Sequence, residues 1–102
     1  MRIEVSAFDP AALDGLVARS LPQQGCVEIQ RDAPGKHHAW HQHARDETLL
    51  ILEGSLTFLH GDTQTDCRPG DAIFLPAGTP HASIAQGAGA TYLIAFHTVE
   101  LA

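Results

Sequence analysis

From residue 26 onward, glycines, prolines and aspartates divide the chain into short apolar or alternating runs, and this spacing constrains the fold most strongly. About eight short runs separated by turn residues are typical of a β-sandwich or β-barrel. We therefore predict an all-β fold. The predicted strands are residues 26–31, 37–43, 48–52, 55–60, 64–67, 71–75, 81–85 and 90–99.

The N-terminal region has a different pattern. Residues 1–7 alternate between apolar and polar side chains, as in a half-buried strand. Asp9 followed by Pro10 suits an N-cap with proline at the first helical position, and leucines then recur at helical spacing. We expect one short helix near residues 10–20.

Two further segments carry local predictions. Gly54 is expected to turn a hairpin between the strands on either side of it, and residues 86–89 are expected to form a second hairpin loop. Residues 49–52 are apolar on both faces, which suits a strand between the core and another layer or subunit. We therefore expect a homodimer.

The composition limits the classes of function. A chain of 102 residues suits one domain, here residues 1–102. Twelve acidic residues against six Lys and Arg give a net charge of −6, the wrong sign for binding nucleic-acid phosphates. No apolar run approaches the roughly 20 residues that cross a bilayer. We expect a cytoplasmic protein without a nucleic-acid or membrane partner, with Cys26 and Cys67 as buried, reduced thiols.

Histidines supply the candidate chemistry. His41 and His43 are two residues apart on a predicted strand, so both imidazoles can lie on one face. Glu47 begins the next strand after a polar turn, and His81 opens a later strand after a loop rich in proline and glycine. Three imidazoles and one carboxylate can thus converge inside a barrel, and this is a donor set that transition metals accept.

Nine positions in and around this set fall into two spaced motifs. The first, over residues 35–54, reads Gly35-x5-His41-x-His43-x3-Glu47-x6-Gly54, and the second, within residues 70–85, reads Gly70-x5-Pro76-x-Gly78-x2-His81. All nine positions match the two motifs of the cupin superfamily, so the chain resembles a small single-domain cupin. The second motif often ends in an asparagine, whereas this chain has Ala85.

The resemblance implies a cupin β-barrel, also called a jelly roll or double-stranded β-helix, with one short N-terminal helix. It also implies that His41, His43, Glu47 and His81 bind one divalent transition metal near the mouth of the barrel. Four protein ligands leave positions for water or substrate on a five- or six-coordinate ion. Fe, Mn, Ni, Cu and Zn all accept these ligands.

Strand parity predicts the surroundings of the metal. His37 shares the parity of His41, so we expect it to face the pocket as a catalytic proton donor or acceptor. His38 and His60 are expected at the surface, and Arg45 is expected to be solvated. The expected substrate pocket is mostly apolar. Its predicted lining is Leu49, Ile51, Ile73, Leu75, Ser83 and Ala85.

Several functions are compatible with such a barrel. The favoured one is a metal-dependent oxygenase or lyase that acts on a small organic molecule at the open metal positions, with Glu47 as a catalytic base. A metal-dependent isomerase is the second, and a non-catalytic barrel that senses a small ligand is the third.

Overall fold

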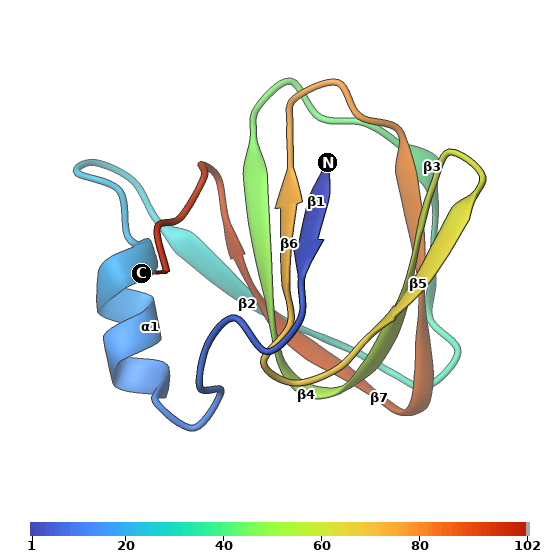
Figure 1. Cartoon of the computed structure of the whole chain (residues 1–102), viewed down its shortest axis with the longest axis horizontal. Helices are drawn as coiled ribbons and strands as arrows, with labels where there is room; N and C mark the ends of the chain where they lie inside the picture. Colours follow the sequence, from blue (N-terminus) through green and yellow to red (C-terminus); the bar gives the residue numbers. More distant parts are fainter. Residues whose placement is uncertain (102) are drawn as a thin grey trace.

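The computed structural model describes residues 1–101, and they form an all-β fold with one short helix (Figure 1), as predicted. The strands share one antiparallel sheet. The elements in chain order are β1 (Arg2–Glu4), α1 (Leu13–Ser20), β2 (Val27–Asp32), β3 (His37–His41), β4 (Glu47–His60), β5 (Thr63–Cys67), β6 (Ala72–Leu75) and β7 (His81–Ala95).

The two long strands β4 and β7 organise the sheet. They pair with each other over most of their length, and the strand order is β1-β6-β4-β7-β2. β3 pairs with the first part of β7, and β5 pairs with the second part of β4. Both long strands curve across the bottom of Figure 1, so that they join the side that holds β1 and β6 to the side that holds β3 and β5.

The two predicted hairpins are absent from the described residues, because β4 continues through Gly54 and β7 continues through residues 86–89. Gly54 pairs with Ala90, whereas the next residue, Ser55, pairs with Gln86, so residues 87–89 bulge out of the ladder. Gly54 has a φ of 74°, and a Cβ atom there would overlap the Gly89 carbonyl oxygen. The glycine therefore permits a close approach between two long strands, and the local turn signal was misread as a hairpin.

The N-terminal elements are shorter than predicted. β1 ends at Glu4, and Ser6 has a positive φ of 54°, which takes the chain out of the strand. Asp9 does not cap the helix. Its Oδ1 instead accepts a 2.9 Å hydrogen bond from the N–H of Ala11 within a preceding turn, and α1 begins only at Leu13.

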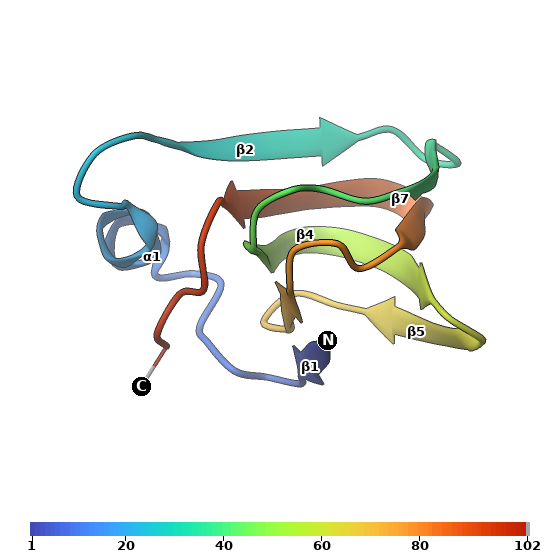
Figure 2. The same ribbon diagram turned by 90° about the horizontal axis from the view of Figure 1, so that it is seen from above.

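The apolar stretch at the start of β4 packs on both sides within this chain. Leu49 and Ile51 belong to the cluster inside the curved sheet. Leu50 belongs to a second cluster that also contains Leu16 of α1. Figure 2 shows α1 at one end of the strands, beside the start of β2. The additional layer expected from the sequence is therefore formed at least in part by the helix of the same chain.

Within residues 1–101, no helix combines the length and the apolar character that crossing a membrane requires.

The β4–β7 ladder joins distant parts of the chain. It runs from Thr48 opposite Ala95 to Leu59 opposite Ala82. This ladder carries residues of both sequence motifs, and it brings the start of β7 beside the end of β3 through the additional β3–β7 pairing.

Candidate metal centre

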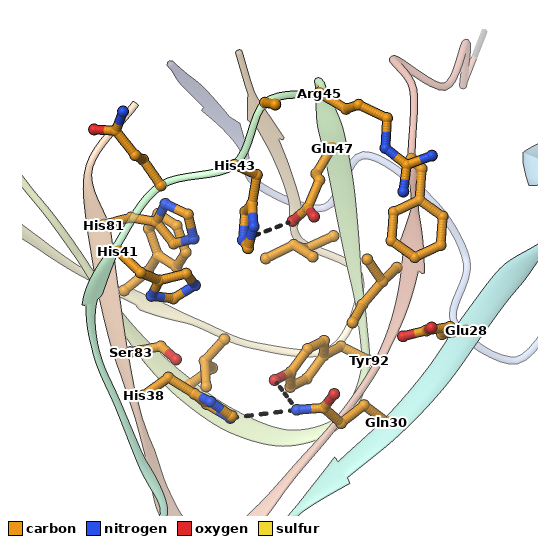
Figure 3. A pocket seen from close by; sticks show the side chains of 17 residues that line it. Glu28, Gln30, His38, His41, His43, Arg45, Glu47, His81, Ser83 and Tyr92 are labelled. Atoms are coloured by element: carbon orange, nitrogen blue, oxygen red, sulfur yellow. Dashed lines mark hydrogen bonds and ion pairs between the residues drawn. The ribbon is translucent and has the colours of Figure 1, made fainter. Parts of the chain in front are cut away.

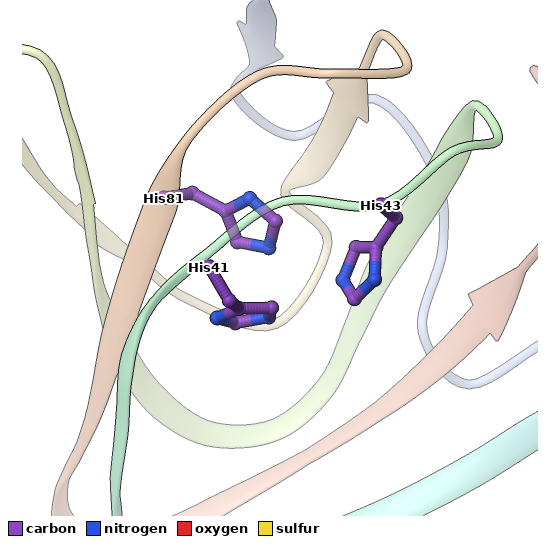
Figure 4. Close-up of side chains that lie close together, drawn as sticks. All are labelled: His41, His43 and His81. Carbon is purple, nitrogen blue, oxygen red and sulfur yellow. The ribbon is translucent and has the colours of Figure 1, made fainter.

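Three histidines converge at one end of the curved sheet (Figure 4). His41 ends β3, His43 lies in the loop that follows, and His81 begins β7. His41 and His81 are paired directly across the β3–β7 ladder. One nitrogen from each of the three rings lies within 4.8 Å of the others. Three imidazole nitrogens at this spacing can bind a single divalent metal ion.

Backbone carbonyls fix two of these rings. Nδ1 of His41 donates a 2.6 Å hydrogen bond to the Ala39 carbonyl, and Nδ1 of His81 donates a 2.9 Å hydrogen bond to the Thr79 carbonyl. Each neutral ring therefore carries its lone pair on Nε2, the atom left for a metal. This is the arrangement found at metal-binding histidines, so the donor set fits a metal ion.

The environment of His81 also favours the neutral ring. His81 is 4% exposed, and the Phe58 ring stacks on it with an interplanar angle of 15°. Burial lowers the pKa of His81, and the nearby His41 and His43 lower it further, whereas the hydrogen bond to Thr79 raises it. The net shift is downward, so the ring stays available as a metal ligand at a more acidic pH than an ordinary histidine.

Glu47 lies beside the three histidines, at the start of β4. Its Oε1 is 3.6 Å from Nε2 of His43. Burial raises the pKa of Glu47, although the charges of His43 and His41 oppose that shift. The structure thus brings the three predicted imidazoles into one cluster and places the predicted carboxylate next to one of them.

The loops of the two motifs are tied to each other. The N–H of Gly78 donates a 2.8 Å hydrogen bond to the His43 carbonyl, and the N–H of Ala77 donates a 2.9 Å hydrogen bond to Oδ1 of Asp46. The turn before β7 therefore holds the loop after β3 in place. These contacts position His43, which lies outside a strand, relative to His81.

A cavity of about 610 Å³ opens next to the histidines (Figure 3). Of the six predicted lining residues, Leu49 and Ser83 face this cavity, whereas Ile51, Ile73, Leu75 and Ala85 belong to the buried core and are not part of the lining. The lining is also more polar than expected. The additional residues are Glu28, Gln30, His38, Gln42, Ala44, Arg45, Leu56, Phe58, Tyr92, Ile94 and Phe96.

A bulge in β3 reverses the expectation for two histidines. His38 pairs with Ser83 and His41 pairs with His81, so three steps along β3 match two steps along β7. The extra residue shifts strand parity by one. His38 consequently lines the cavity with His41, while His37 lies outside the lining and is exposed. Sequence parity assumed a regular strand and therefore selected His37.

A hydrogen-bonded cluster around Asp32 forms another part of the wall, and sequence analysis missed it. Asp32 is 4% exposed, and its carboxylate accepts hydrogen bonds from Tyr92 Oη at 2.8 Å, His38 Nε2 at 2.9 Å and Gln30 Nε2 at 3.0 Å. The signal available in the sequence was weak. Gln30 and Asp32 share the parity of one strand, but their partners come from β3 and β7.

Burial raises the pKa of Asp32, but the hydrogen bonds from Tyr92 and Gln30, together with the electrostatic effect and the hydrogen bond of His38, outweigh it, so the net shift is downward. The carboxylate is therefore ionised at neutral pH. Burial, together with the bond to Asp32, raises the pKa of the Tyr92 phenol. Tyr92 thus stays protonated and acts as a hydrogen-bond donor.

Arg45 is exposed, as predicted, but it also makes a specific contact. Its guanidinium lies over the Phe96 ring, with Cζ 4.8 Å from the ring centroid, and it forms part of the cavity rim. A stacked guanidinium keeps its hydrogen-bond donors free for a planar anion. The cavity therefore has a cationic group at its rim, which the sequence did not indicate.

The remaining histidines and cysteines lie outside the cavity lining. His97 donates a 2.8 Å hydrogen bond from Nε2 to the Ser20 carbonyl at the end of α1. Cys67 is buried, and burial raises the pKa of its thiol to about 12, but Cys26 is exposed, contrary to expectation. The two thiols form no disulfide with each other.

The curved antiparallel sheet and the three-histidine cluster define a cupin-type protein with a candidate site for a divalent metal. Comparison with known families agrees. The model of the cupin domain family matches residues 28–97, so the chain belongs to the cupin family.

Similar proteins include bacterial lyases. A dimethylsulfoniopropionate lyase, DddQ, from Ruegeria pomeroyi is 40% identical over 50 residues, which cover 48% of this chain and 25% of that protein. A crystal structure of DddQ from the same organism superposes with a TM-score of 0.63 and 30% identity, over 67% of this chain and 35% of the other. The matched region thus corresponds to about a quarter of the curated relative.

Two other solved structures show the same fold. A cupin superfamily protein from Desulfitobacterium hafniense has a TM-score of 0.63 and 26% identity, covering 76% of this chain and 73% of the other. An oxalate decarboxylase from Bacillus subtilis, studied for its Mn(II) centres, has a TM-score of 0.65 and 26% identity, covering 72% of this chain and 21% of the other.

Proposed function

We propose that this cupin is a metal-dependent lyase that acts on a small carboxylate. The observation that carries the proposal is the convergence of His41, His43 and His81 beside an open cavity, with the carboxylate of Glu47 next to them. These four residues would hold one divalent metal ion. Bound there, such an ion supplies Lewis-acid chemistry by drawing electron density from a substrate oxygen.

The cavity rim supports an anionic substrate. Arg45 presents a guanidinium that is stacked on Phe96, and this group can bind a carboxylate through two parallel hydrogen bonds. We propose that Arg45 orients the carboxylate while the cavity holds the rest of the molecule. A cavity of about 610 Å³ has ample room for a small organic acid.

Two relatives support a lyase in preference to an oxygenase. One is named a dimethylsulfoniopropionate lyase and the other an oxalate decarboxylase. Both names describe the cleavage of a bond within a carboxylate. Because this chain matches only part of each relative, its substrate is inferred as a chemical class, a small carboxylate, and the metal as one of Fe, Mn, Ni, Cu or Zn.

The test begins with elemental analysis of protein purified without an affinity tag. The protein is then loaded with each of these five metals and incubated with dimethylsulfoniopropionate, other 3-substituted propionates and oxalate. Products are followed by NMR, and dissolved oxygen is measured in parallel. Formation of an unsaturated acid or of formate without oxygen consumption supports the lyase, whereas stoichiometric oxygen uptake would establish an oxygenase instead. Tight binding without any product would make the protein a ligand-binding cupin.

Arg45 provides a sharper test of the substrate class. Arg45→Gln removes the charge and the paired donors, so the KM for a carboxylate should rise about 10-fold or more, while Arg45→Lys keeps the charge and should lose less. The corresponding amide or methyl ester is the control substrate, because it lacks the anion. An equal effect of Arg45→Gln on acid and ester would remove Arg45 from carboxylate binding.

A further inference from the structure

The hydrogen bonds around Asp32 determine which nitrogen of His38 carries a proton. The ionised carboxylate of Asp32 can only accept, so the hydrogen in its 2.9 Å contact with His38 belongs to Nε2 of His38. The two amide hydrogens of Gln30 are directed to its two shorter contacts, Asp32 at 3.0 Å and Tyr92 Oη at 2.9 Å. Its longer contact, 3.3 Å to Nε2 of His38, therefore leaves the Nε2 hydrogen of that ring directed to Asp32. The neutral His38 ring therefore has its lone pair on Nδ1.

That lone pair is available. Within residues 1–101, no protein group forms a hydrogen bond with Nδ1 of His38. The His38 side chain is 31% exposed and lines the same cavity as the three-histidine cluster. Figure 3 shows His38, Gln30 and Tyr92 together at the end of the cavity away from Glu47 and His43.

The position of His38 relative to the metal centre follows from the ladder. Its partner Ser83 and the partner of His41, His81, are two residues apart on β7. Two residues of a strand span roughly 6.6 Å, so His38 occupies the next inward position beside the centre. A small molecule that contacts a metal held by His41 and His81 would therefore extend toward His38.

From this geometry we infer that His38 is the proton acceptor of the lyase reaction and that Asp32 is its positioning residue. This inference rests on the proposed function. Buried, hydrogen-bonded carboxylates orient the imidazole and stabilise its cationic form when a histidine acts as a base. Tyr92 and Gln30 would in turn hold Asp32. The three residues around His38 would thus keep its ring in place, with Nδ1 free to accept a proton.

For a 3-substituted propionate, the proposed reaction removes one proton and one substituent from neighbouring carbon atoms. Nδ1 of His38 takes the proton from the carbon next to the carboxylate, and the electron pair of that C–H bond becomes the new C=C bond. The bond to the substituent on the following carbon breaks, and its electron pair leaves with the substituent. His38 then releases the proton from Nδ1 to solvent, which restores the neutral ring.

His38→Gln is the informative variant, because the glutamine amide can still donate a hydrogen bond to Asp32 but cannot accept a proton near neutral pH. With dimethylsulfoniopropionate or the best 3-substituted propionate of the screen, we expect kcat to fall at least about 100-fold at unchanged metal content and nearly unchanged KM. Deuterium at C2 of the substrate should slow the variant more than the wild type, because proton abstraction becomes rate-limiting. His37→Gln, on the opposite face of β3, is the matched comparison and should retain full activity.

A second measurement needs neither metal nor substrate. The ¹⁵N chemical shifts of His38 in the metal-free protein should report the Nε2–H tautomer at neutral pH, and Asp32→Asn should change them. An Nδ1–H tautomer in the wild type would overturn the inference, as would full activity of His38→Gln in an active wild-type background. An inactive wild type with every substrate and metal would instead show that the proposed lyase function is wrong.

Discussion

Tyr92 Oη donates a 2.8 Å hydrogen bond to Oδ2 of Asp32, a residue 60 positions earlier in the sequence. The bond joins β7 to β2 inside the cavity wall, and Asp32 is nearly inaccessible to solvent. A buried carboxylate needs several hydrogen-bond donors to remain charged. This contact therefore contributes to the stability of the fold, and it helps to keep Asp32 as the acceptor for the Nε2 hydrogen of His38.

We therefore expect Tyr92→Phe to lower the free energy of unfolding by about 1–3 kcal/mol, because Asp32 loses one donor and the Gln30 amide loses an acceptor. Urea unfolding followed by circular dichroism measures the change. The metal content should stay at the wild-type level, since Tyr92 is not one of the converging rings. Wild-type stability in this variant would mean that solvent replaces the phenol at no cost.

The carboxylate of Asp32 should also make the stability of the protein depend on pH in the acidic range. The pKa of Asp32 is lowered in the folded protein and is about 3.9 in an unfolded chain. Its contribution to stability is thus fully present above the unfolded pKa and is lost as the pH falls through the lower folded pKa. Asp32→Asn lacks this titration. The stability difference between wild type and Asp32→Asn should therefore shrink between about pH 5 and pH 2, as measured by urea unfolding at each pH. A constant difference over that range would show that folding does not lower the pKa of Asp32, so that its hydrogen bonds do not favour the charged form.

Removal of one imidazole should empty the centre and preserve the fold. We expect His41→Ala and His81→Ala to lose bound metal, because two remaining imidazoles beside Glu47 hold an ion weakly. Circular dichroism should still show a folded β protein, since the core clusters do not include His41 or His81. His37→Gln is the control and should retain the metal. Unfolding of both alanine variants would indicate a metal that is needed for structure.

Glu47→Gln tests the carboxylate separately from the rings. The amide keeps the size of the side chain but removes the charge near His43. We expect metal affinity to fall less than in His41→Ala, and turnover to fall while metal is still bound. Isothermal titration with the metal alone separates these two effects. Wild-type affinity together with wild-type turnover would exclude Glu47 from the centre.

The close approach of Gly54 to Gly89 predicts that a larger residue at position 54 prevents normal folding. Gly54→Ala places a Cβ atom against the backbone of Gly89 at a position with positive φ, and neither strand can move without breaking the ladder. We expect a loss of at least about 3 kcal/mol or a failure to fold. Gly15→Ala is the matched control, because a Cβ atom there meets nothing within 4 Å in the exposed face of α1. It should stabilise the protein by roughly 0.5–1 kcal/mol.

Much of the fold could be predicted, because the apolar runs and turn residues are local signals. The two hairpin predictions failed for one shared reason. Gly54 and residues 86–89 have the composition of hairpin turns, but their partners in the ladder let both strands continue. A single sequence contains no information about which backbone lies opposite a glycine, so close approach and reversal of direction could not be distinguished.

Part of the candidate site could likewise be predicted from the sequence, and part could not. The convergence of His41, His43 and His81 could be predicted from motif spacing, which reflects a fixed loop geometry. The exchange of His37 for His38 could not, because one extra residue in β3 changes parity without any mark in the sequence. The Asp32 cluster and the Arg45 stack on Phe96 depend on side chains from separate strands and loops, so only the folded structure reveals them.

The direct pairing of His41 with His81 gives the metal centre a mechanical consequence as well as a chemical one. An ion held by both rings would clamp β3 to β7 at the end of β3. If β3 slipped by one residue, His41 would turn to the opposite face and the clamp would open. Binding of a metal ion would therefore lock the alignment of these two strands. The polypeptide around the cavity would be stiffer in the metal-bound protein than in the metal-free protein.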